Sequence, residues 1–401
     1  METAVAHNGL VEVPVGLLKV GMYIAAVDRP WLDTPFAVQG FMIDNEADID
    51  YVAAHCAHVY VDPRRRARKK LAVRHAVPSS GPRNTTSLKN ELRRAKIDYE
   101  SASSVVEKVF DQVKKNRHLD VSAVESVVAP LIKSVYRNNE ALAAMLRMKQ
   151  KSEYIHSHCI STAVWAILLA RHMGFDQEEL KVLALGAAMI DVGMVNVPEH
   201  VLEKPGPLTA NEQKLVRSHV KSGLRLVEEA GTVNHRVIEI IACHHERHDG
   251  SGYPKGLAGQ DIPLTARMVG IADAYDAMIT SRPFRQARTS FEAIQELGDL
   301  KGSAFHPDLT EAFTQAVGIF PTGSIVELNS GEVGIVVGQN PHRRLKPQII
   351  VVLDKHKQPY QRFVTCDLQR CDDDARAGQK LWITAELQPG AHGLDAQNYF
   401  L

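Results

Sequence analysis

The feature that most constrains this chain is the placement of histidines and aspartates at the ends of apolar segments between residues 150 and 320. The pair His244-His245 follows the run VIEIIAC, Asp273 follows VGIA, and Asp191 follows LALGAAMI. Apolar residues recur here at helical spacing, so each of these side chains is predicted on, or at the end of, a helix. A polar group beside such a segment costs free energy unless it is paired or coordinates a cation. The middle of the chain is therefore predicted to be a helical domain that holds buried polar residues.

Six of these residues form a predicted metal site: His158, Asp191, His219, His244, His245 and Asp273. Imidazole and carboxylate groups are ligands for first-row metals such as iron, manganese and zinc. Two neighbouring metal ions can activate water and stabilise the displacement at a phosphoryl group. Taken singly, however, a helical His or Asp is more often a hydrogen-bonding residue than a ligand, and the spacing of the six does not decide between these roles.

The loop HHERHDGSGYPKG at residues 244–256 decides in favour of metal ligands. By composition alone it is equally a phosphate-binding loop or an ordinary turn. As a string it resembles the HD-GYP family, whose signature HHExxDGxGYP is matched in full. The resemblance continues through VLEKPGPLTANE at 201–212, ARMVGIADAYDAM at 266–278 and RPFR at 282–285. Residues 11–62 resemble the domain of unknown function that often precedes HD-GYP domains, and the segment SIVELNSGEVGIVV resembles the β-extension that follows them.

This resemblance implies a cytoplasmic, metal-dependent phosphodiesterase that hydrolyses cyclic di-GMP to the linear dinucleotide or GMP. It places two divalent metal ions, iron or manganese, on the six residues named above, with Asp191 bridging them as the catalytic residue. The phosphate-binding pair of the family falls on Arg282 and Arg285. Its signature loop falls on Gly252, Tyr253 and Pro254, and the Tyr253 ring offers a face on which a guanine can stack.

The central motif departs from the family pattern HDxGK, because Ile190 replaces its His and Met194 replaces its Lys. A Glu that three-metal members carry is replaced by Tyr154, which argues against a third metal ion. One metal position keeps four ligands: Asp191, His219, His244 and His245. The other keeps three: His158, Asp191 and Asp273. We therefore expect a weakened second metal position and slow turnover.

Three functions remain open at this point. The first is a slow phosphodiesterase, favoured by the intact ligands, arginines and loop. The second is a non-catalytic receptor for cyclic di-GMP, favoured because Ile190 and Met194 replace residues of the chemistry while the binding residues remain. The third is a partner-binding module without nucleotide. The third is disfavoured, because buried His and Asp side chains without a metal ion would be destabilising.

The predicted fold class is mainly α, with a helical HD-GYP core between a small α/β domain and a β-rich extension. The predicted boundaries are an α/β domain at 1–62, a basic linker at 63–87, linker helices at 88–149, the HD-GYP domain at 150–320 and the extension at 321–401. The linker helices are either a signalling coupler or a helical hairpin packed on the next domain, and the sequence does not choose between these.

Local patterns predict the elements within these domains. Strands are expected at 17–27, 41–43 and 58–61, with a helix at 47–55. A helix with apolar positions from Val105 to Val113 precedes one from Ser122 to Met148, which Ser122 and Glu125 would cap and Pro130 would kink. Further helices are expected at 154–172, 178–191, 209–230, 235–244 and 264–279, and further strands at 324–328, 334–338 and 348–353.

Composition excludes several other classes of function. The chain has 47 Lys and Arg against 47 Asp and Glu, so no overall positive field exists for binding nucleic acid or an anionic bilayer. The longest apolar runs are too short to cross a membrane, and the first residues lack the pattern of a signal peptide. Five scattered cysteines fit a reducing cytoplasm. The expected partner is cyclic di-GMP. Cyclic di-GMP synthases and a homodimer are suggested only by the family's habits and by the position of the N-terminal domain.

Overall fold

The computed structural model describes residues 10–29, 41–43, 46–63, 84–116, 118–148, 154–231, 233–281, 286–340, 344–370 and 381–400. It divides into two compact units, each described by itself below. The first comprises Met1–Ala76 with Pro341–Leu345, and the second comprises Val77–Asn340 with Lys346–Leu401.

The first unit contains a four-stranded antiparallel sheet in the order β1-β4-β2-β3, with one helix. Its elements are β1 (Val11–Pro14), a 3-10 turn η1 (Val15–Leu17), β2 (Tyr23–Val27), β3 (Phe41–Met42), α1 (Glu46–Ala53) and β4 (His58–Val61). The core includes the fully buried Ile24, Ile43, Val52 and Val59. The α/β character is confirmed. The strand expected from residue 17 begins only at Tyr23, because residues 15–17 form η1, and β1 was not predicted.

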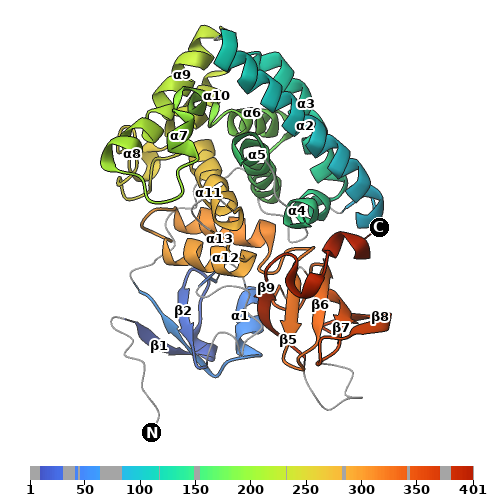
Figure 1. Cartoon of the computed structure of the whole chain (residues 1–401). Helices are drawn as coiled ribbons and strands as arrows, with labels where there is room; N and C mark the ends of the chain where they lie inside the picture. Colours follow the sequence, from blue (N-terminus) through green and yellow to red (C-terminus); the bar gives the residue numbers. More distant parts are fainter. Residues whose placement is uncertain are drawn as a thin grey trace. The chain divides into compact units, whose positions relative to one another are not determined.

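The second unit is mostly helical (Figure 1). Its first helices are α2 (Leu88–Asn116), α3 (Val121–Arg137), α4 (Asn139–Met148), α5 (Tyr154–His172) and α6 (Gln177–Ala188). The next are η3 (Val192–Asn196), α7 (Glu199–Leu202), α8 (Ala210–Arg217), α9 (His219–Glu229) and α10 (His235–Cys243). The last are η4 (Gly259–Asp261), α11 (Leu264–Ile279), α12 (Ser290–Asp299) and α13 (Pro307–Val317).

Helix α5 forms the centre of this unit. Every residue from Ser157 to Arg171 is buried, as expected for a helix that is apolar on all sides and is covered on all sides. It contacts α2, α6, α11 and α13. The central helix therefore carries His158 into the interior.

Three of the expected helices have boundaries that differ from those observed. The helix expected from Ser122 to Met148 ends at Arg137, and α4 begins after Asn138, whose backbone is extended. The Asn138 side chain accepts a hydrogen bond from the N–H of Glu140 and donates to Thr86, so it caps α4 while tying it to the start of α2. The cap of α3 is Asp120 rather than Ser122, and Pro130 lies within α3.

The helix expected at 209–230 is also divided, into α8 and α9, at Ser218. Its predicted start is confirmed, because Thr209 and Glu212 form a reciprocal capping box. The helix expected to end at Asp191 stops at Ala188 and is followed by η3. These breaks put Asp191 and His219 at helix starts.

The linker helices pack on the helical domain. Helix α2 contacts α3, α4, α5 and η3. The hydroxyl of Tyr99 on α2 donates to the carbonyl of Ser157, at 3.2 Å, and lies 3.0 Å from the hydroxyl of Ser161. The hairpin arrangement is thus observed.

The C-terminal part is a five-stranded antiparallel sheet in the order β8-β7-β6-β5-β9. Its strands are β5 (Ile325–Leu328), β6 (Val333–Gly338), β7 (Gln348–Leu353), β8 (Pro359–Asp367) and β9 (Ile383–Leu387). The three expected strands correspond to β5, β6 and β7, whereas β8 and β9 were not predicted. The buried Glu386 on β9 pairs with Arg147 of α4 at 3.1 Å and accepts a hydrogen bond from the N–H of Phe291. The fold class, mainly α with an α/β unit before it and a β-rich extension after it, is confirmed.

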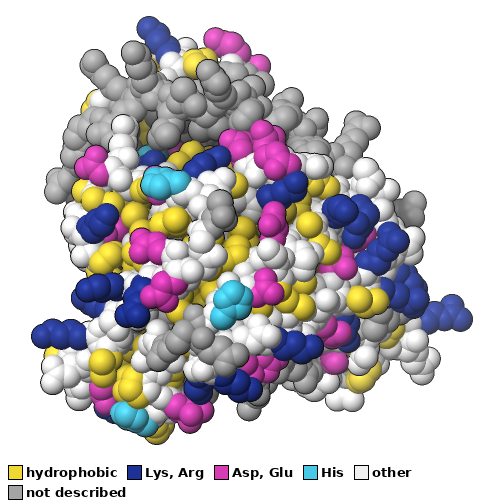
Figure 2. Space-filling model, turned by 90° about the horizontal axis from the view of Figure 1, so that it is seen from above, with side chains coloured by type: hydrophobic (Ala, Val, Ile, Leu, Met, Phe, Trp, Pro, Cys, Tyr) yellow, Lys and Arg dark blue, Asp and Glu magenta, His cyan; other side chains and the backbone are white. Residues whose placement is uncertain are grey.

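In the part of the chain that the structure describes, no helix has the length and hydropathy needed to cross a membrane. Basic and acidic side chains are interspersed over the face shown in Figure 2. Four of the cysteines, Cys56, Cys159, Cys243 and Cys366, are free thiols and buried.

Candidate metal centre

Four of the six predicted ligands converge in the interior of the helical unit. Asp191 flanks the start of η3, His219 is the first residue of α9, and His244 and His245 follow α10. Each residue offers one donor atom, and these four atoms all lie within 4.8 Å of one another. The Nε2 atom of His219 is 3.4 Å from Oδ1 of Asp191 and 3.3 Å from Nε2 of His244. Such a group of donors fits a single divalent cation of the first row.

Backbone carbonyls fix the orientation of two of the imidazoles. The Nδ1 atom of His219 lies 2.7 Å from the carbonyl oxygen of Val216, and Nδ1 of His244 lies 2.9 Å from that of Ile241. A carbonyl only accepts, so each Nδ1 carries the proton, and each Nε2 presents a lone pair to the cluster. This is the tautomer that a metal ligand needs.

Burial keeps the histidine pair neutral. It lowers the pKa of His244 to about 4, and the neighbouring His219 acts in the same direction. Burial also lowers the pKa of His245 well below its usual value, with His244 adding to the effect. Because metal ions bind the unprotonated imidazole, both side chains are in the binding form near neutral pH.

A close approach of two backbone segments brings Asp191 to His219. A Cβ atom on Gly193 would overlap the carbonyl oxygen of His219 and would lie 2.5 Å from the amide nitrogen of Gly223. Only glycine therefore lets η3 pack directly on the first turn of α9. This contact joins two ligands that are far apart in the sequence.

The other two predicted ligands, His158 and Asp273, lie together beside this cluster. The Nε2 atom of His158 donates to Oδ1 of Asp273 at 2.8 Å, and Asp273 Oδ2 is 3.8 Å from Nδ1 of His245. On its other side, His158 Nδ1 donates to Oδ2 of Asp276 at 2.7 Å. The remaining oxygen of Asp276 accepts a hydrogen bond from the indole N–H of Trp165 at 3.0 Å.

Asp276 is a site residue that the sequence interpretation missed. It lies three residues after Asp273 on α11, so the two carboxylates share one face of the helix, and this spacing could have identified it. Burial opposes a charge on His158, but the hydrogen bonds to Asp273 and Asp276 outweigh it and raise the pKa of His158 well above its usual value. The pKa of Asp273 is lowered despite its burial, chiefly by the hydrogen bond from His158.

The two substituted positions bring no donor to this second group. Ile190 is fully buried, and Met194 is half-buried in η3. Of the ligands expected at the second position, His158 and Asp273 are hydrogen-bonded to each other, and Asp191 belongs to the four-donor cluster.

The signature loop lies against the cluster. The Tyr253 ring stacks on the imidazole of His245, with ring centroids 4.7 Å apart and an interplanar angle of 29°. The guanidinium of Arg217 lies over the same ring, 4.9 Å from its centroid. His245 and Arg217 both contact the Tyr253 ring, so a guanine can stack on the part of the ring under Arg217 only if Arg217 moves aside. Arg217 was not among the predicted site residues.

The rest of the loop is held by Glu246, a buried carboxylate that accepts hydrogen bonds from the N–H groups of Lys255 and Leu257. Gly252 is half-buried, and Pro254 is exposed and follows a cis peptide bond. Arg282 and Arg285 lie outside the described residues, as does the side chain of Tyr154.

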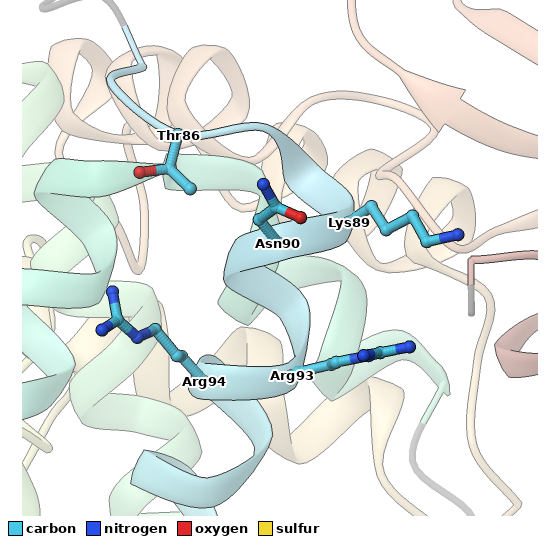
Figure 3. Close-up of a pocket in the computed structure, with 5 residues that line it drawn as sticks. All are labelled: Thr86, Lys89, Asn90, Arg93 and Arg94. Carbon is cyan, nitrogen blue, oxygen red and sulfur yellow. The ribbon is translucent and has the colours of Figure 1, made fainter.

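A depression of about 400 Å³ lies at the start of α2 (Figure 3). It is lined by Thr86, Lys89, Asn90, Arg93 and Arg94. The side chains of Arg93 and Arg94 point to different sides of the helix, so these cations do not converge on one point. This pocket offers neither imidazole nor carboxylate donors and is not a metal site.

Comparison with known proteins agrees with this architecture. Residues 135–309 match the model of an HD domain. Residues 10–124 match a domain of unknown function (DUF3391), so that match extends through α2, and residues 325–371 match a KOW domain associated with HD domain. The fold and the buried His and Asp residues therefore define an HD-domain protein.

Similar curated proteins identify the family within the HD-domain class. The chain is 32% identical over 381 residues to a cyclic di-GMP phosphodiesterase of Pseudomonas aeruginosa, a match that spans 92% of this chain and 90% of the relative. It therefore belongs to the same family and is a homologue of HD-GYP-type cyclic di-GMP phosphodiesterases. The cyclic di-GMP phosphodiesterase response regulator RpfG of Xanthomonas campestris is 38% identical over 146 residues, covering 36% of this chain and 39% of the relative. Among solved structures, an HDG"Y"P protein from Bdellovibrio bacteriovorus matches 76% of this chain and 98% of its own, at 19% identity and a TM-score of 0.47.

Proposed function

We propose that this protein is a metal-dependent phosphodiesterase that hydrolyses cyclic di-GMP to linear pGpG and then GMP, at a reduced rate. The observation that carries the proposal is the cluster of Asp191, His219, His244 and His245, whose donors converge directly beside the Tyr253 loop. The activity named for the Pseudomonas relative, which matches nearly the whole chain, supports the choice of substrate.

The proposed ligand roles follow the two groups of side chains. The four-donor cluster would hold one divalent ion, iron or manganese. A second ion would be held less firmly by His158, Asp273 and a shared Asp191, since Ile190 offers no donor. When bound, such ions polarise a phosphoryl oxygen and lower the pKa of water. Asp191, as the residue common to both positions, is the proposed catalytic residue.

The surrounding residues would orient these groups. The carbonyls of Val216 and Ile241 hold the imidazoles of His219 and His244 with Nε2 facing inward. The Asp276 carboxylate holds the His158 ring from the opposite side.

Substrate binding is proposed for Arg282 and Arg285, which would take up phosphate charge, and for the loop residues Gly252, Tyr253 and Pro254. The two arginines are assigned from the sequence resemblance alone.

The substitutions argue for slow turnover. Loss of one group that stabilises transition-state charge costs about 10²–10³ in rate, by analogy with an oxyanion-hole donor, and Met194 stands where the family has such a cation. Loss of a residue that supports a metal ligand lowers the metal affinity about 10–100-fold. Loss of the ligand itself, at position 190, should lower the metal affinity at least as much.

A second candidate function is a receptor that binds cyclic di-GMP without hydrolysing it. The observation that favours it is the pairing of the substitutions, since Ile190 and Met194 both lie beside Asp191 while the Tyr253 loop is retained. The buried cluster of donors disfavours a module without any metal ion or nucleotide.

Turnover separates these candidates. Protein purified without oxygen and loaded with ferrous iron or manganese is incubated with cyclic di-GMP, and the products are separated by chromatography, with Asp191→Asn as the control. We expect linear dinucleotide or GMP that disappears in the control. Binding of the nucleotide without any product would establish the receptor instead, and the absence of both metal and nucleotide binding would exclude both functions.

A further inference from the structure

Arg217 occupies a position in the candidate site that neither the family resemblance nor the comparisons assign. It is the last residue of α8, two residues before His219. Its guanidinium lies over the Tyr253 ring, which in turn stacks on His245 of the metal cluster. A row of three side chains therefore leads from the surface to the metal cluster: Arg217, Tyr253 and His245.

No described carboxylate neutralises the positive charge of Arg217. Its side chain is exposed, and among the described residues no carboxylate forms an ion pair with it. Two other cations of this region do form ion pairs: Lys204 with Glu212, and Arg225 with Glu229. The ring attracts the guanidinium through its charge and is not a conventional hydrogen-bond acceptor, so the N–H groups of Arg217 stay available to an anion.

The sequence lacks a cation where one is expected. Met194 stands in η3 at the position of the family's lysine, and the site contains two buried carboxylates, Asp191 in the cluster and Asp273 beside it. A guanidinium binds phosphate through two parallel hydrogen bonds, which is stronger and more directional than a single neutral contact.

We propose that Arg217 binds a phosphate of the cyclic dinucleotide and supplies the positive charge that Met194 does not. Tyr253 then positions Arg217 in addition to lining the proposed substrate site. This inference rests on the proposed binding of a cyclic dinucleotide and adds one further residue that contributes to its affinity.

The test compares Arg217→Met with Arg225→Met. Both remove an exposed arginine, but Arg225 lies on α9 and its guanidinium is held by Glu229, so the second variant controls for net charge. Full-length manganese-loaded protein is titrated calorimetrically with cyclic di-GMP and with 3′3′-cyclic GMP–AMP, which has the same two phosphates and one different base. Where product forms, KM and kcat are measured instead.

Arg217→Met should weaken binding of both nucleotides about 10-fold or more, the loss expected for a hydrogen bond between charged groups. Arg225→Met should leave the affinity within about twofold. The added change Met194→Lys should restore affinity in the Arg217→Met protein. Metal content and thermal midpoint should match the wild type, since a merely structural role would alter the midpoint and would not be rescued.

The outcomes distinguish this inference from the proposed function. If the wild type binds cyclic di-GMP and Arg217→Met binds it equally well, the role of Arg217 is refuted and the function stands. If only cyclic GMP–AMP binds, and does so through Arg217, the inference stands and the choice of cyclic di-GMP is refuted. A wild-type protein that binds neither nucleotide overturns both.

Discussion

Substituting Gly193 by alanine tests how the candidate metal centre is assembled. Gly193 lies in η3, two residues after Asp191, where it packs on the first turn of α9. A Cβ added there would lie 2.5 Å from the amide nitrogen of Gly223, whereas an ordinary Cβ contact needs about 3.4 Å. The segments must separate by the difference, about 0.9 Å, and by more at the overlapping carbonyl oxygen of His219.

That displacement acts directly on two ligands. His219 begins α9 and Asp191 flanks η3, and the atoms Nε2 and Oδ1 of these residues are 3.4 Å apart. Ligand distances in a metal site are fixed to within about 0.2 Å, so a shift near 0.9 Å is several times the tolerance. We expect Gly193→Ala to lose at least 10–100-fold in metal affinity. We also expect it to lose about 1–3 kcal/mol of stability, the usual cost of overpacking, while the chain still folds.

The assay is metal content per chain after equilibration in buffered manganese, with circular dichroism and a thermal midpoint measured on the same sample. Gly298→Ala is the matched control, because Gly298 lies in α12 with no atom within 4 Å of an added Cβ. The control should keep its metal and gain about 0.5–1 kcal/mol. Metal binding by Gly193→Ala equal to the wild type would refute the idea that this contact sets the ligand geometry.

Three further outcomes are expected. Ile190→His should raise the bound metal from about one to about two ions per chain, because it completes the donors at the second position. Asp276→Asn should reduce the metal affinity of that position about 10–100-fold, since the charged partner of His158 is removed. Metal-free protein should lose stability in urea titrations as the pH falls from about 6.5 towards about 4. The folded-state pKa of His244 is lowered to about 4, so the unfolded chain binds more protons in that window.

The controls are variants at neighbouring positions. Ile190→Leu should leave the metal content unchanged, and an unchanged content in Ile190→His would contradict the account of the missing ligand. Asp276→Asn with wild-type affinity would show that Trp165 and packing suffice to hold His158. For the pH series, His244→Gln should reduce the pH dependence of stability between pH 6.5 and 4, and a stability that rises on acidification would contradict the assigned sign.

Much of the helical domain is predictable from local pattern. The buried helix α5 agrees with the expected range 154–172, and the capping box at Thr209 and Glu212 marks the start of α8 correctly. Apolar periodicity and capping chemistry act over a few residues, so the sequence reports them directly. The break at Asn138 was missed because its cause is a hydrogen bond to Thr86, a residue far away along the chain.

The sequence by itself determined the candidate donors and the missing ones. The residue types, their positions after apolar runs, and the substitutions Ile190 and Met194 are all visible without coordinates. The tertiary structure alone decided which donors converge, that Asp276 holds His158 from behind, and that Arg217 lies over Tyr253. The physical reason is that periodicity identifies the buried face of a helix but not which helix ends meet, and that meeting depends on close backbone contacts such as the one at Gly193.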